Sequence, residues 1–359
     1  MRIAQVAPLW ERVPPPAYGG TELVVSLLTE ELVRRGHQVT LFASGDSQTF
    51  AKLVPGCEYA LRPLGALPQD DAVYEQMQLS TVFQQASEFD MIHCHLDYLA
   101  LPYASLSKTP VVHTLHGIFT PLTEKIFKQH HSQHYISISN SQQRPDLGLN
   151  YAATVHNAIA VDQFTYYPES EQPPYLAFLG RMSVEKGPHL AIAIAKQTGW
   201  HLKMAGKIDF ENKGFFEREV LPHVDGKQIE FLGEADHRVK NELLGGATAT
   251  LFPITWCEPF GLVMIESMAC GTPVIAMALG AAPEVIVDGK TGFICDSLAE
   301  CVKAVSEVSA LDRSASRHHA KTYFGIQRMV DDYEAVYRQV LSDRFVQNGH
   351  IRTPLPMAS

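Results

Sequence analysis

The 359-residue sequence has few cysteines, no long apolar run and no excess of basic residues. Its six cysteines form no C-x-x-C pair, which argues against a disulfide framework and favours reduced, mostly buried thiols. No uninterrupted apolar stretch reaches the roughly 20 residues that span a bilayer. The first ten residues lack the basic and apolar regions of a signal peptide. We therefore expect a cytoplasmic protein, with peripheral membrane contact left open.

Acidic residues outnumber basic ones, and the formal charge is −10 with a pI of about 5.9. This balance argues against a nucleic-acid-binding surface. Hydrophobic residues make up 46% of the chain and charged residues 19%, which is typical of a globular protein. Because 359 residues exceed what one hydrophobic core usually serves, two domains are expected.

Short apolar runs alternate with helical patterns along both halves of the chain. Such strands, separated by helices, are typical of a parallel sheet that is covered on both faces. The proline- and acid-rich segment 166–174 interrupts the alternation and is typical of a linker between two domains. We predict an α/β protein of two doubly wound domains facing across a cleft, with ligands at the carboxyl ends of the strands. The predicted strands are 2–8, 38–44, 89–95, 110–116, 135–139, 175–180, 201–206, 228–233, 248–254, 273–279 and 292–296.

The stretch EPFGLVMIE, residues 258–266, carries two glutamates in an apolar setting. Pro259 favours entry into a helix whose first N–H groups would suit a phosphate, and Gly261 permits close approach. Glu266 lies roughly 9 Å further along and has no evident ion-pair partner. A nucleotide sugar has the matching order of sugar, diphosphate and ribose, and a carboxylate can hold a vicinal diol. The alternative is a helix-end charge at Glu258 and a solvated Glu266.

The stretch GRMSVEKG, residues 180–187, connects a predicted strand to a predicted helix. It carries Arg181 and Lys186. A guanidinium fork and an ammonium group can stabilise a diphosphate leaving group without a metal ion. The alternative is a surface loop with ordinary charges.

The stretch PPPAYGGTE, residues 14–22, ends the first predicted strand and opens a helix. Gly19 and Gly20 permit close approach of a ligand to the backbone, and Thr21 is the predicted N-cap. The G-x-G-x-x-G fingerprint of dinucleotide-binding proteins is absent. Tyr18 could contact an acceptor, and an ordinary loop residue is the alternative.

His116 closes the predicted strand 110–116, where its side chain would face the cleft. It could donate a hydrogen bond to a sugar hydroxyl or to the departing oxygen, and a merely packed histidine is the alternative. Zinc binding by His93, His95, His113 and His116 is disfavoured because these residues lack the spacing of zinc ligands. No metal site is predicted.

Together these motifs resemble the retaining glycosyltransferases of family 4, which have the two-domain GT-B fold. The most specific element is the E-x7-E pair of Glu258 and Glu266, followed by SMACGTPVIA and PEVIVDGKTGF. The stretch GRMSVEKG, the HG pair at 116–117 and the early double glycine agree with the family in order and spacing. The PPxxYGGT segment also resembles a smaller subgroup that includes an avilamycin-pathway glycosyltransferase.

The resemblance implies three parts of the chain. Residues 1–168 would form the Rossmann-like domain on the acceptor side, and residues 169–325 would form the domain that binds the nucleotide-sugar donor. Residues 326–359 would hold a C-terminal helix at 326–343, which returns to the first domain, and a frayed tail.

By the same resemblance, Arg181 and Lys186 would hold the donor diphosphate and assist catalysis. Glu258 would bind the donor sugar, and His116 would bind a sugar hydroxyl near the reacting carbon. Glu266 would take the ribose, and no cofactor or bound metal is implied. The implied donor-binding residues are Gly19, Gly20, Arg181, Lys186, Phe260, Gly261, Leu262, Val263 and Glu266.

Two stretches depart from the family pattern. His-Asn-Ala at 156–158 stands where relatives often have Pro-Asn-Gly, and we expect it to alter the link between the domains. Gly-Ala-Ala at 280–282 stands where Gly-Gly often precedes Pro-Glu, and we expect it to narrow the pocket beside the donor sugar. Glu284, which follows, is expected to be structural.

The predicted activity is hexosyl transfer from a UDP- or GDP-sugar to a hydroxyl of a glycan, a lipid or a small molecule, with retention of configuration. No residue is placed as a covalent nucleophile, so we expect front-side departure in which the leaving phosphate oxygen takes the acceptor's proton. Two alternatives remain open: a nucleotide-sugar 2-epimerase on the same fold, and a non-catalytic nucleotide-sugar-binding protein.

Overall fold

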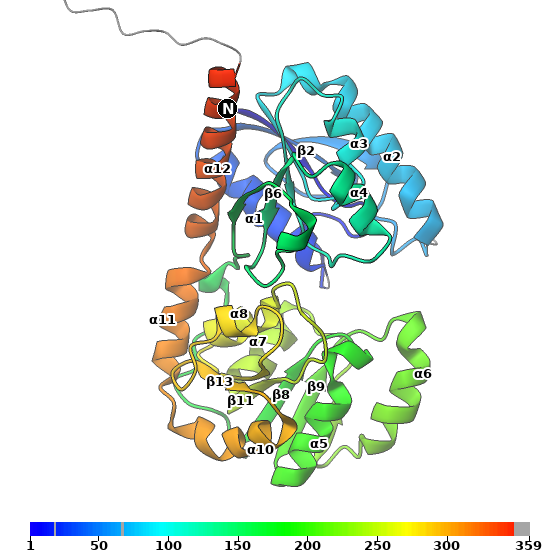
Figure 1. Cartoon of the computed structure of the whole chain (residues 1–359). Helices are drawn as coiled ribbons and strands as arrows, with labels where there is room; N and C mark the ends of the chain where they lie inside the picture. Colours follow the sequence, from blue (N-terminus) through cyan, green and yellow to red (C-terminus); the bar gives the residue numbers. More distant parts are fainter. Residues whose placement is uncertain (18, 66–67, 348–359) are drawn as a thin grey trace, which may run out of the picture.

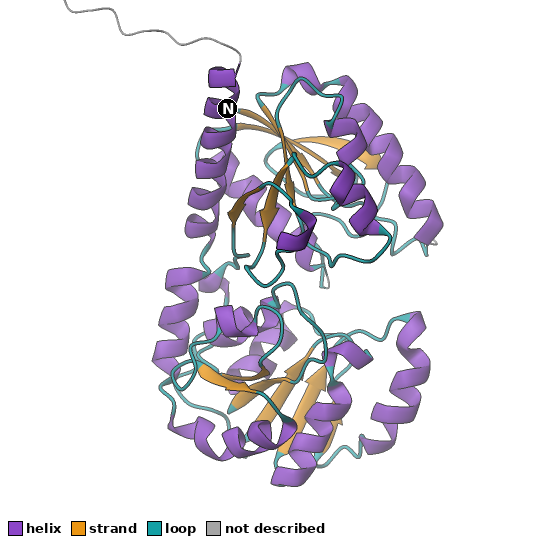
Figure 2. Ribbon diagram, in the orientation of Figure 1, coloured by secondary structure: helices purple, strands orange, loops and turns teal. Residues whose placement is uncertain are grey.

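Two parallel β-sheets flanked by helices make up the structure (Figure 2). The computed structural model describes residues 1–17, 19–65 and 68–347. Tyr18 and the tail 348–359, for which the sequence predicts an acceptor contact and a frayed end, lie outside the described residues. The two sheets confirm the predicted α/β class with two doubly wound domains.

The first sheet has seven strands in the order β3-β2-β1-β4-β5-β6-β7, and every neighbouring pair is parallel. The strand order reverses beside β1, so the loops that follow β1 and β4 diverge and leave room for a ligand between them. The strands are β1 (Arg2–Val6), β2 (Gln38–Ser44), β3 (Lys52–Cys57), β4 (Met91–Cys94), β5 (Val111–Thr114), β6 (His134–Ser137) and β7 (Tyr151–Thr154).

The second sheet has six parallel strands in the order β10-β9-β8-β11-β12-β13. Its order reverses beside β8, so the loops after β8 and β11 diverge in the same way. The strands are β8 (Tyr175–Leu179), β9 (His201–Ala205), β10 (Ile229–Phe231), β11 (Ala249–Phe252), β12 (Val274–Met277) and β13 (Gly292–Cys295).

The helices bury apolar residues against these sheets. In α1, for example, Val24, Leu28 and Leu32 recur at helical spacing and are fully buried against the first sheet. No helix among the described residues combines the length and the apolar character needed to cross a membrane. The α-helices are α1 (Gly20–Arg34), α2 (Pro68–Gln84), α3 (Leu101–Ala104), α4 (Thr123–Gln129), α5 (Pro188–Thr198), α6 (Lys213–Phe215), α7 (His237–Gly246), α8 (Leu262–Ala269), α9 (Ala282–Val285), α10 (Leu298–Glu307), α11 (Arg313–Tyr323) and α12 (Ile326–Gln347).

The sequence pattern predicts a helix near residues 211–222, but the structure is irregular there. The segment near 211–222 forms the single turn α6, then a π-helical turn at Phe216–Val220 and a 3₁₀ turn at Leu221–His223. Pro222 lies in that last turn and has no N–H to continue an α-helix. The sequence pattern alone therefore overestimated the regularity of this helix.

The last helix, α12, returns to the first domain, as predicted. Figure 1 shows it lying alongside that domain, whereas α11 lies beside the second one. Tyr333 and Tyr337 of α12 are fully buried among residues of α1 and the first sheet. Arg35 and His37, just after α1, bind Asp331 and Glu334 of α12 at 2.6 and 2.7 Å. The helix is thus part of the core of the first domain.

Two chain segments cross between the domains side by side. The Ile159 N–H donates to the Phe324 carbonyl at 3.0 Å, and Ile159 also forms a β-bridge with Gly325. The ring of His156 lies 5.9 Å from that of Phe324. Phe164 already packs in the core of the second domain, so the first crossing precedes it. The boundary placed at residue 168 stays a prediction.

Glu284 of α9 joins the two domains at this crossing. Its carboxylate accepts hydrogen bonds from the backbone N–H groups of Asn140 and Ser141, after β6, at 2.8 and 2.6 Å. It also contacts His156 Nε2 at 3.2 Å. Burial alone would raise the pKa of Glu284, but the hydrogen bonds from His156 and the two amides outweigh it and lower that pKa to about 2.

We expect Glu284→Gln to lower the free energy of unfolding by about 3 kcal/mol at pH 7. Because the folded pKa lies below the ordinary value of 4.5, this contribution is present above pH 4.5 and is lost as the pH falls toward 2. Urea unfolding at several pH values measures the difference between the variant and the natural protein. That difference should shrink below pH 4.5, and the exposed control Glu307→Gln should change little. A difference that does not depend on pH would contradict this account.

Candidate functional site

A cleft of about 450 Å³ lies between the two domains. Its walls include the loops after β1, β5, β8, β9 and β11, together with the first turns of α1 and α8. Three of these strands lie where the strand order of a sheet reverses, which is where doubly wound sheets usually bind ligands. All the predicted site residues line this cleft, namely Gly19, Gly20, His116, Arg181, Lys186, Glu258, Phe260, Gly261, Leu262, Val263 and Glu266.

Helices α1 and α8 begin at the cleft, one from each domain. A Cβ atom on Gly20 would lie 3.3 Å from Leu262 Cδ1, so the two helix starts nearly touch. The N-cap of α1 is Gly19 rather than the predicted Thr21. Gly19 has φ 141°, and a Cβ atom there would lie 2.7 Å from Pro15 Cβ, so only glycine fits. Both helices direct the positive ends of their dipoles into the cleft.

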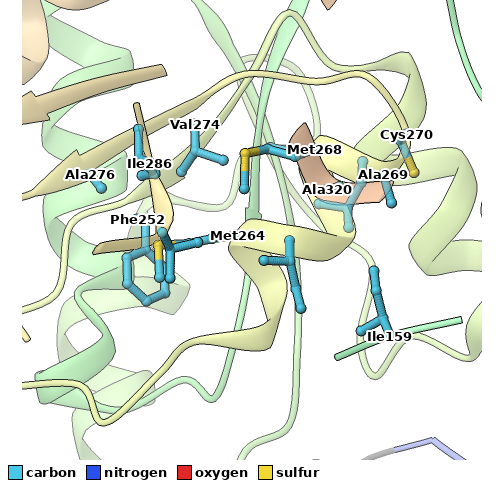
Figure 3. Packing of buried hydrophobic residues seen from close by; sticks show 14 of the residues in the cluster. Ile159, Phe252, Met264, Met268, Ala269, Cys270, Val274, Ala276, Ile286 and Ala320 are labelled. Carbon is cyan, nitrogen blue, oxygen red and sulfur yellow. The ribbon is translucent and has the colours of Figure 1, made fainter. Parts of the chain in front are cut away.

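Helix α8 is held rigidly by its own apolar residues. Met264 and Met268 are fully buried, Met264 beside Phe252 at the end of β11 and Met268 near Val274 (Figure 3). Gly261 caps the helix with φ 87°, and a Cβ atom there would lie 2.8 Å from Phe252 Cζ. The free N–H groups of the first turn, which includes Leu262, therefore stay at the cleft, where they suit an anionic group.

Glu258 is fixed by groups of the same domain. Its carboxylate oxygen Oε2 forms an ion pair with Lys186 Nζ and accepts a hydrogen bond from Trp256 Nε1 at 2.8 Å. The ammonium group of Lys186 also lies 5.1 Å from the centre of the Trp256 ring, within the range of a cation–π contact. Glu258, Lys186 and Trp256 therefore form one connected group on the wall of the cleft.

Arg181 lies in a second charged group on the same wall. Its guanidinium contacts Glu185 at 3.1 Å and Asp209 at 3.7 Å. Asp209 also contacts Lys207 at 3.3 Å and, from the first domain, Arg62 at 3.6 Å. Within the part of the chain that the structure describes, both carboxylates that contact Arg181 are therefore partly exposed.

Glu266 differs from its predicted environment in one respect. It is 4% exposed and its Oε1 binds Lys240 Nζ of α7 at 2.6 Å. The sequence showed no partner because Lys240 lies 26 residues away and becomes a neighbour only when α7 packs beside α8. The alternative of a solvated surface glutamate is therefore wrong. The ion pair fixes the carboxylate at the cleft.

His116 lies on the opposite wall, in the first domain. Its backbone N–H donates to Asp97 Oδ1 at 2.9 Å, and its ring nitrogen Nε2 lies 2.9 Å from Nδ1 of the buried His95. Burial lowers the pKa of His116 to about 4, so the ring is neutral at pH 7. No group of three or more His, Cys, Asp or Glu side chains in the described part of the chain could hold a metal ion.

The alanines at 281 and 282 do not narrow the pocket, contrary to expectation. Ala281 and Ala282 are fully buried in the core of the second domain and do not line the cleft. The close contact at this place is made by Gly280, where a Cβ atom would lie 2.3 Å from the backbone nitrogen of Glu258. Gly280 and Ala281, whose N–H donates to the Glu258 carbonyl at 2.9 Å, therefore support the backbone of Glu258.

The cleft also contains residues that were not predicted from the sequence, among them Lys207, Lys240 and Trp256. Lys207 lies two residues after the end of β9, so its place at a strand end was a signal that could have been used. Trp256 lies two residues before Glu258 in a loop without regular spacing, and Lys240 is on a helix whose neighbours the sequence does not give. Together with Arg181 and Lys186, the two lysines bring four cationic side chains to one cleft.

Comparison with protein-family models identifies two domains. Residues 18–163 match the model described as Glycosyltransferase Family 4, and residues 162–323 match the model described as Glycosyl transferases group 1. A glycogen synthase from Mycobacterium tuberculosis is 24% identical over 93% of this chain and 91% of its own length. An N-acetyl-alpha-D-glucosaminyl L-malate synthase from Bacillus anthracis is 25% identical over 94% of this chain and 97% of its own length.

Solved structures agree in fold. The sucrose-phosphate synthase from Thermosynechococcus elongatus has a TM-score of 0.78 and 19% identity, covering 96% of this chain and all of that one. The protein HepE from Anabaena, in complex with UDP and glucose, has a TM-score of 0.72 and 18% identity, with coverage of 94% and 100%.

A glycosyltransferase involved in avilamycin A biosynthesis has a TM-score of 0.69 and 23% identity, with coverage of 95% and 98%. This likeness shows a shared fold, and membership of its subgroup stays a prediction. The structural neighbours confirm the GT-B fold, and the relatives are named as glycosyltransferases or sugar-product synthases. The chain is therefore a glycosyltransferase, with a Family 4 domain followed by a group 1 domain.

Proposed function

We propose that this glycosyltransferase moves a hexosyl group from a nucleotide diphosphate sugar to a hydroxyl acceptor and retains the anomeric configuration. One observation supports this most strongly: a single cleft collects four cationic side chains, two helix N-termini and the carboxylates of Glu258 and Glu266. This set matches the diphosphate, the sugar and the ribose of such a donor.

The proposed roles follow from position. Arg181 and Lys186, with the amides at Gly261, hold the diphosphate. Glu266, fixed by Lys240, accepts hydrogen bonds from the ribose diol. Glu258 accepts hydrogen bonds from the donor sugar, which would lie between it and the opposite wall of the cleft.

Retention is proposed to occur by front-side departure. The bond from the anomeric carbon to the phosphate oxygen breaks, the acceptor oxygen bonds to the same face of that carbon, and the acceptor's proton passes to the departing phosphate oxygen. The leaving diphosphate gains negative charge, which Arg181 and Lys186 stabilise without a metal ion. The protein otherwise contributes position and the exclusion of water by closure of its domains.

The donor base, the donor sugar and the acceptor are open within this proposal. HepE was solved with UDP and glucose, which supports including UDP-glucose among the donors to test. The two relatives have unlike named products, glycogen and a glucosaminyl malate, and so favour no single acceptor. The 2-epimerase and the non-catalytic binder are disfavoured because the relatives are named as transferases and synthases.

A panel of UDP-, GDP- and ADP-sugars is the direct test. We expect one nucleotide to raise the melting temperature, and NMR to detect slow hydrolysis or transfer of its sugar with retained configuration. EDTA should leave the rate unchanged, because side chains supply the positive charge. Release of a sugar epimerised at C2 would favour the epimerase, and stabilisation without any turnover would favour the binder. An inverted product would contradict the front-side mechanism.

A further inference from the structure

A network of hydrogen-bonded polar side chains extends from the cleft through the core of the first domain to α12. All but His116 are at most 2% exposed, although the core around them is apolar. Burial lowers the pKa of His93 and His95 well below the usual value, so both rings are neutral. In order from the cleft, the members are His116, His95, Gln5, Tyr337, His93, Thr114 and Tyr333.

The amide of Gln5 determines which atoms donate and which accept in the part of this network nearest the cleft. Its carbonyl oxygen Oε1 lies 3.0 Å from His95 Nε2, so Nε2 of His95 must carry the hydrogen and donate it. A neutral imidazole has only one N–H, which leaves His95 Nδ1 as an acceptor. His116 Nε2 lies 2.9 Å from that acceptor and therefore carries a hydrogen.

The part of the network farther from the cleft is consistent with the same orientation of the Gln5 amide. Gln5 Nε2 donates to the Tyr337 hydroxyl at 3.2 Å, and this hydroxyl lies 2.7 Å from His93 Nδ1, to which it donates. His93 Nε2 then donates to Thr114 Oγ1 at 2.7 Å, and Thr114 donates to the Tyr333 hydroxyl at 3.2 Å. Each hydrogen bond of the network thus pairs one donor with one acceptor, which a buried network requires.

His116 Nδ1 is the remaining nitrogen at the cleft end. His116 is half-buried and lines the cleft, and the hydrogen bonds of the described residues leave its Nδ1 without a partner. The two ring nitrogens point in diverging directions, so with Nε2 held by the buried His95, Nδ1 points away from that partner.

We propose that Gln5 and His95 are positioning residues that fix His116 as its Nε2–H tautomer and present a bare Nδ1 to the cleft. His116 then accepts a hydrogen bond from a sugar hydroxyl, rather than donating one to the sugar or to the departing oxygen. This inference rests on the proposed function for the identity of the ligand. It also gives α12 a part in the site, because Tyr337 of that helix holds the Gln5 amide.

The tautomer can be measured on the ligand-free protein. Two-bond ¹⁵N–¹H NMR correlations of protein labelled with ¹⁵N-histidine distinguish Nε2–H from Nδ1–H, and comparison with His116→Gln assigns the His116 signals. We expect hydrogen on Nε2 of His116. Hydrogen on Nδ1, which a turned Gln5 amide would produce, would overturn the proposal. This result does not depend on activity, so it is separate from any failure of the proposed function.

Two variants of similar size test the role of His95. Asparagine can place an acceptor oxygen near the position of Nδ1, whereas leucine cannot. We expect His95→Leu to mix the two tautomers of His116 and to lower kcat by about tenfold, with little change in donor KM. His95→Asn should keep the Nε2–H tautomer and most of kcat. Equal losses of kcat in both variants would show that His95 only packs in the core, which would contradict the proposal. If neither variant folds, the NMR spectrum of the natural protein still tests the tautomer of His116.

Discussion

Arg181→Ala is expected to lower kcat/KM for the donor by about 10²–10³-fold, which is the usual cost of removing one group that stabilises charge in a transition state. The guanidinium would pair with a diphosphate whose charge increases as it leaves. Among the described residues, Glu185 and Asp209 are the ion-pair partners of Arg181, and Glu185 remains bound to Ser183 at 2.6 Å when the guanidinium is removed. The variant should therefore fold normally.

The measurement is steady-state kinetics with the donor that the nucleotide panel selects, together with the melting temperature of each variant. Lys303→Ala removes an exposed lysine of α10 and is the control, for which we expect unchanged kinetics. Lys186→Met should also lower kcat/KM, but it leaves Glu258, which is 8% exposed, without its cationic partner and should therefore cost stability. Unchanged kinetics in both variants would remove the two cations from the donor site.

Glu258→Gln is expected to lower kcat by about 10²–10³-fold while the affinity for the free nucleoside diphosphate stays close to that of the natural protein. The substitution keeps the shape of the side chain but removes its charge. Its partner Lys186 would then turn fully toward the diphosphate, so nucleotide binding is not weakened. The developing positive charge on the donor sugar would lose the nearby carboxylate.

Isothermal titration with the nucleoside diphosphate and single-turnover kinetics separate these two quantities. Glu266→Gln is the matched comparison, because it makes the same chemical change at the other end of the motif. We expect that variant to weaken nucleotide binding, since its carboxylate would hold the ribose. A normal rate in Glu258→Gln, or the same pattern in both variants, would contradict the roles assigned to the two glutamates.

The main features of the fold could be predicted from the sequence because each strand is a short apolar run between helices. The edge strands β3 and β7 could not. Strand β3 contains Pro55 and Gly56, which disfavour a strand, and it is only half-buried at the edge of its sheet. Helix α2 was missed for a related reason, because its apolar residues include the exposed Val73 and Met77 and so mark no clear buried face.

The site could be predicted where one short segment holds several of its groups. Glu258, Gly261 and Glu266 lie on one loop and helix, so their spacing alone suggested an extended ligand. Pairings between distant segments could not be predicted. Lys240 meets Glu266, and Glu284 meets Asn140, only because of how helices and domains pack. For the same reason, the partners of His116 in the core could not be read from its position at a strand end.

We propose that one nucleotide diphosphate sugar lies along this cleft in a defined orientation. A crystal structure of the protein with its intact donor tests this most directly. We expect diphosphate oxygens at about 3 Å from Arg181, Lys186 and the first amides of α8, with the ribose on Glu266 and the sugar beside Glu258. A donor bound elsewhere, or bound with its ribose beside Glu258, would contradict it.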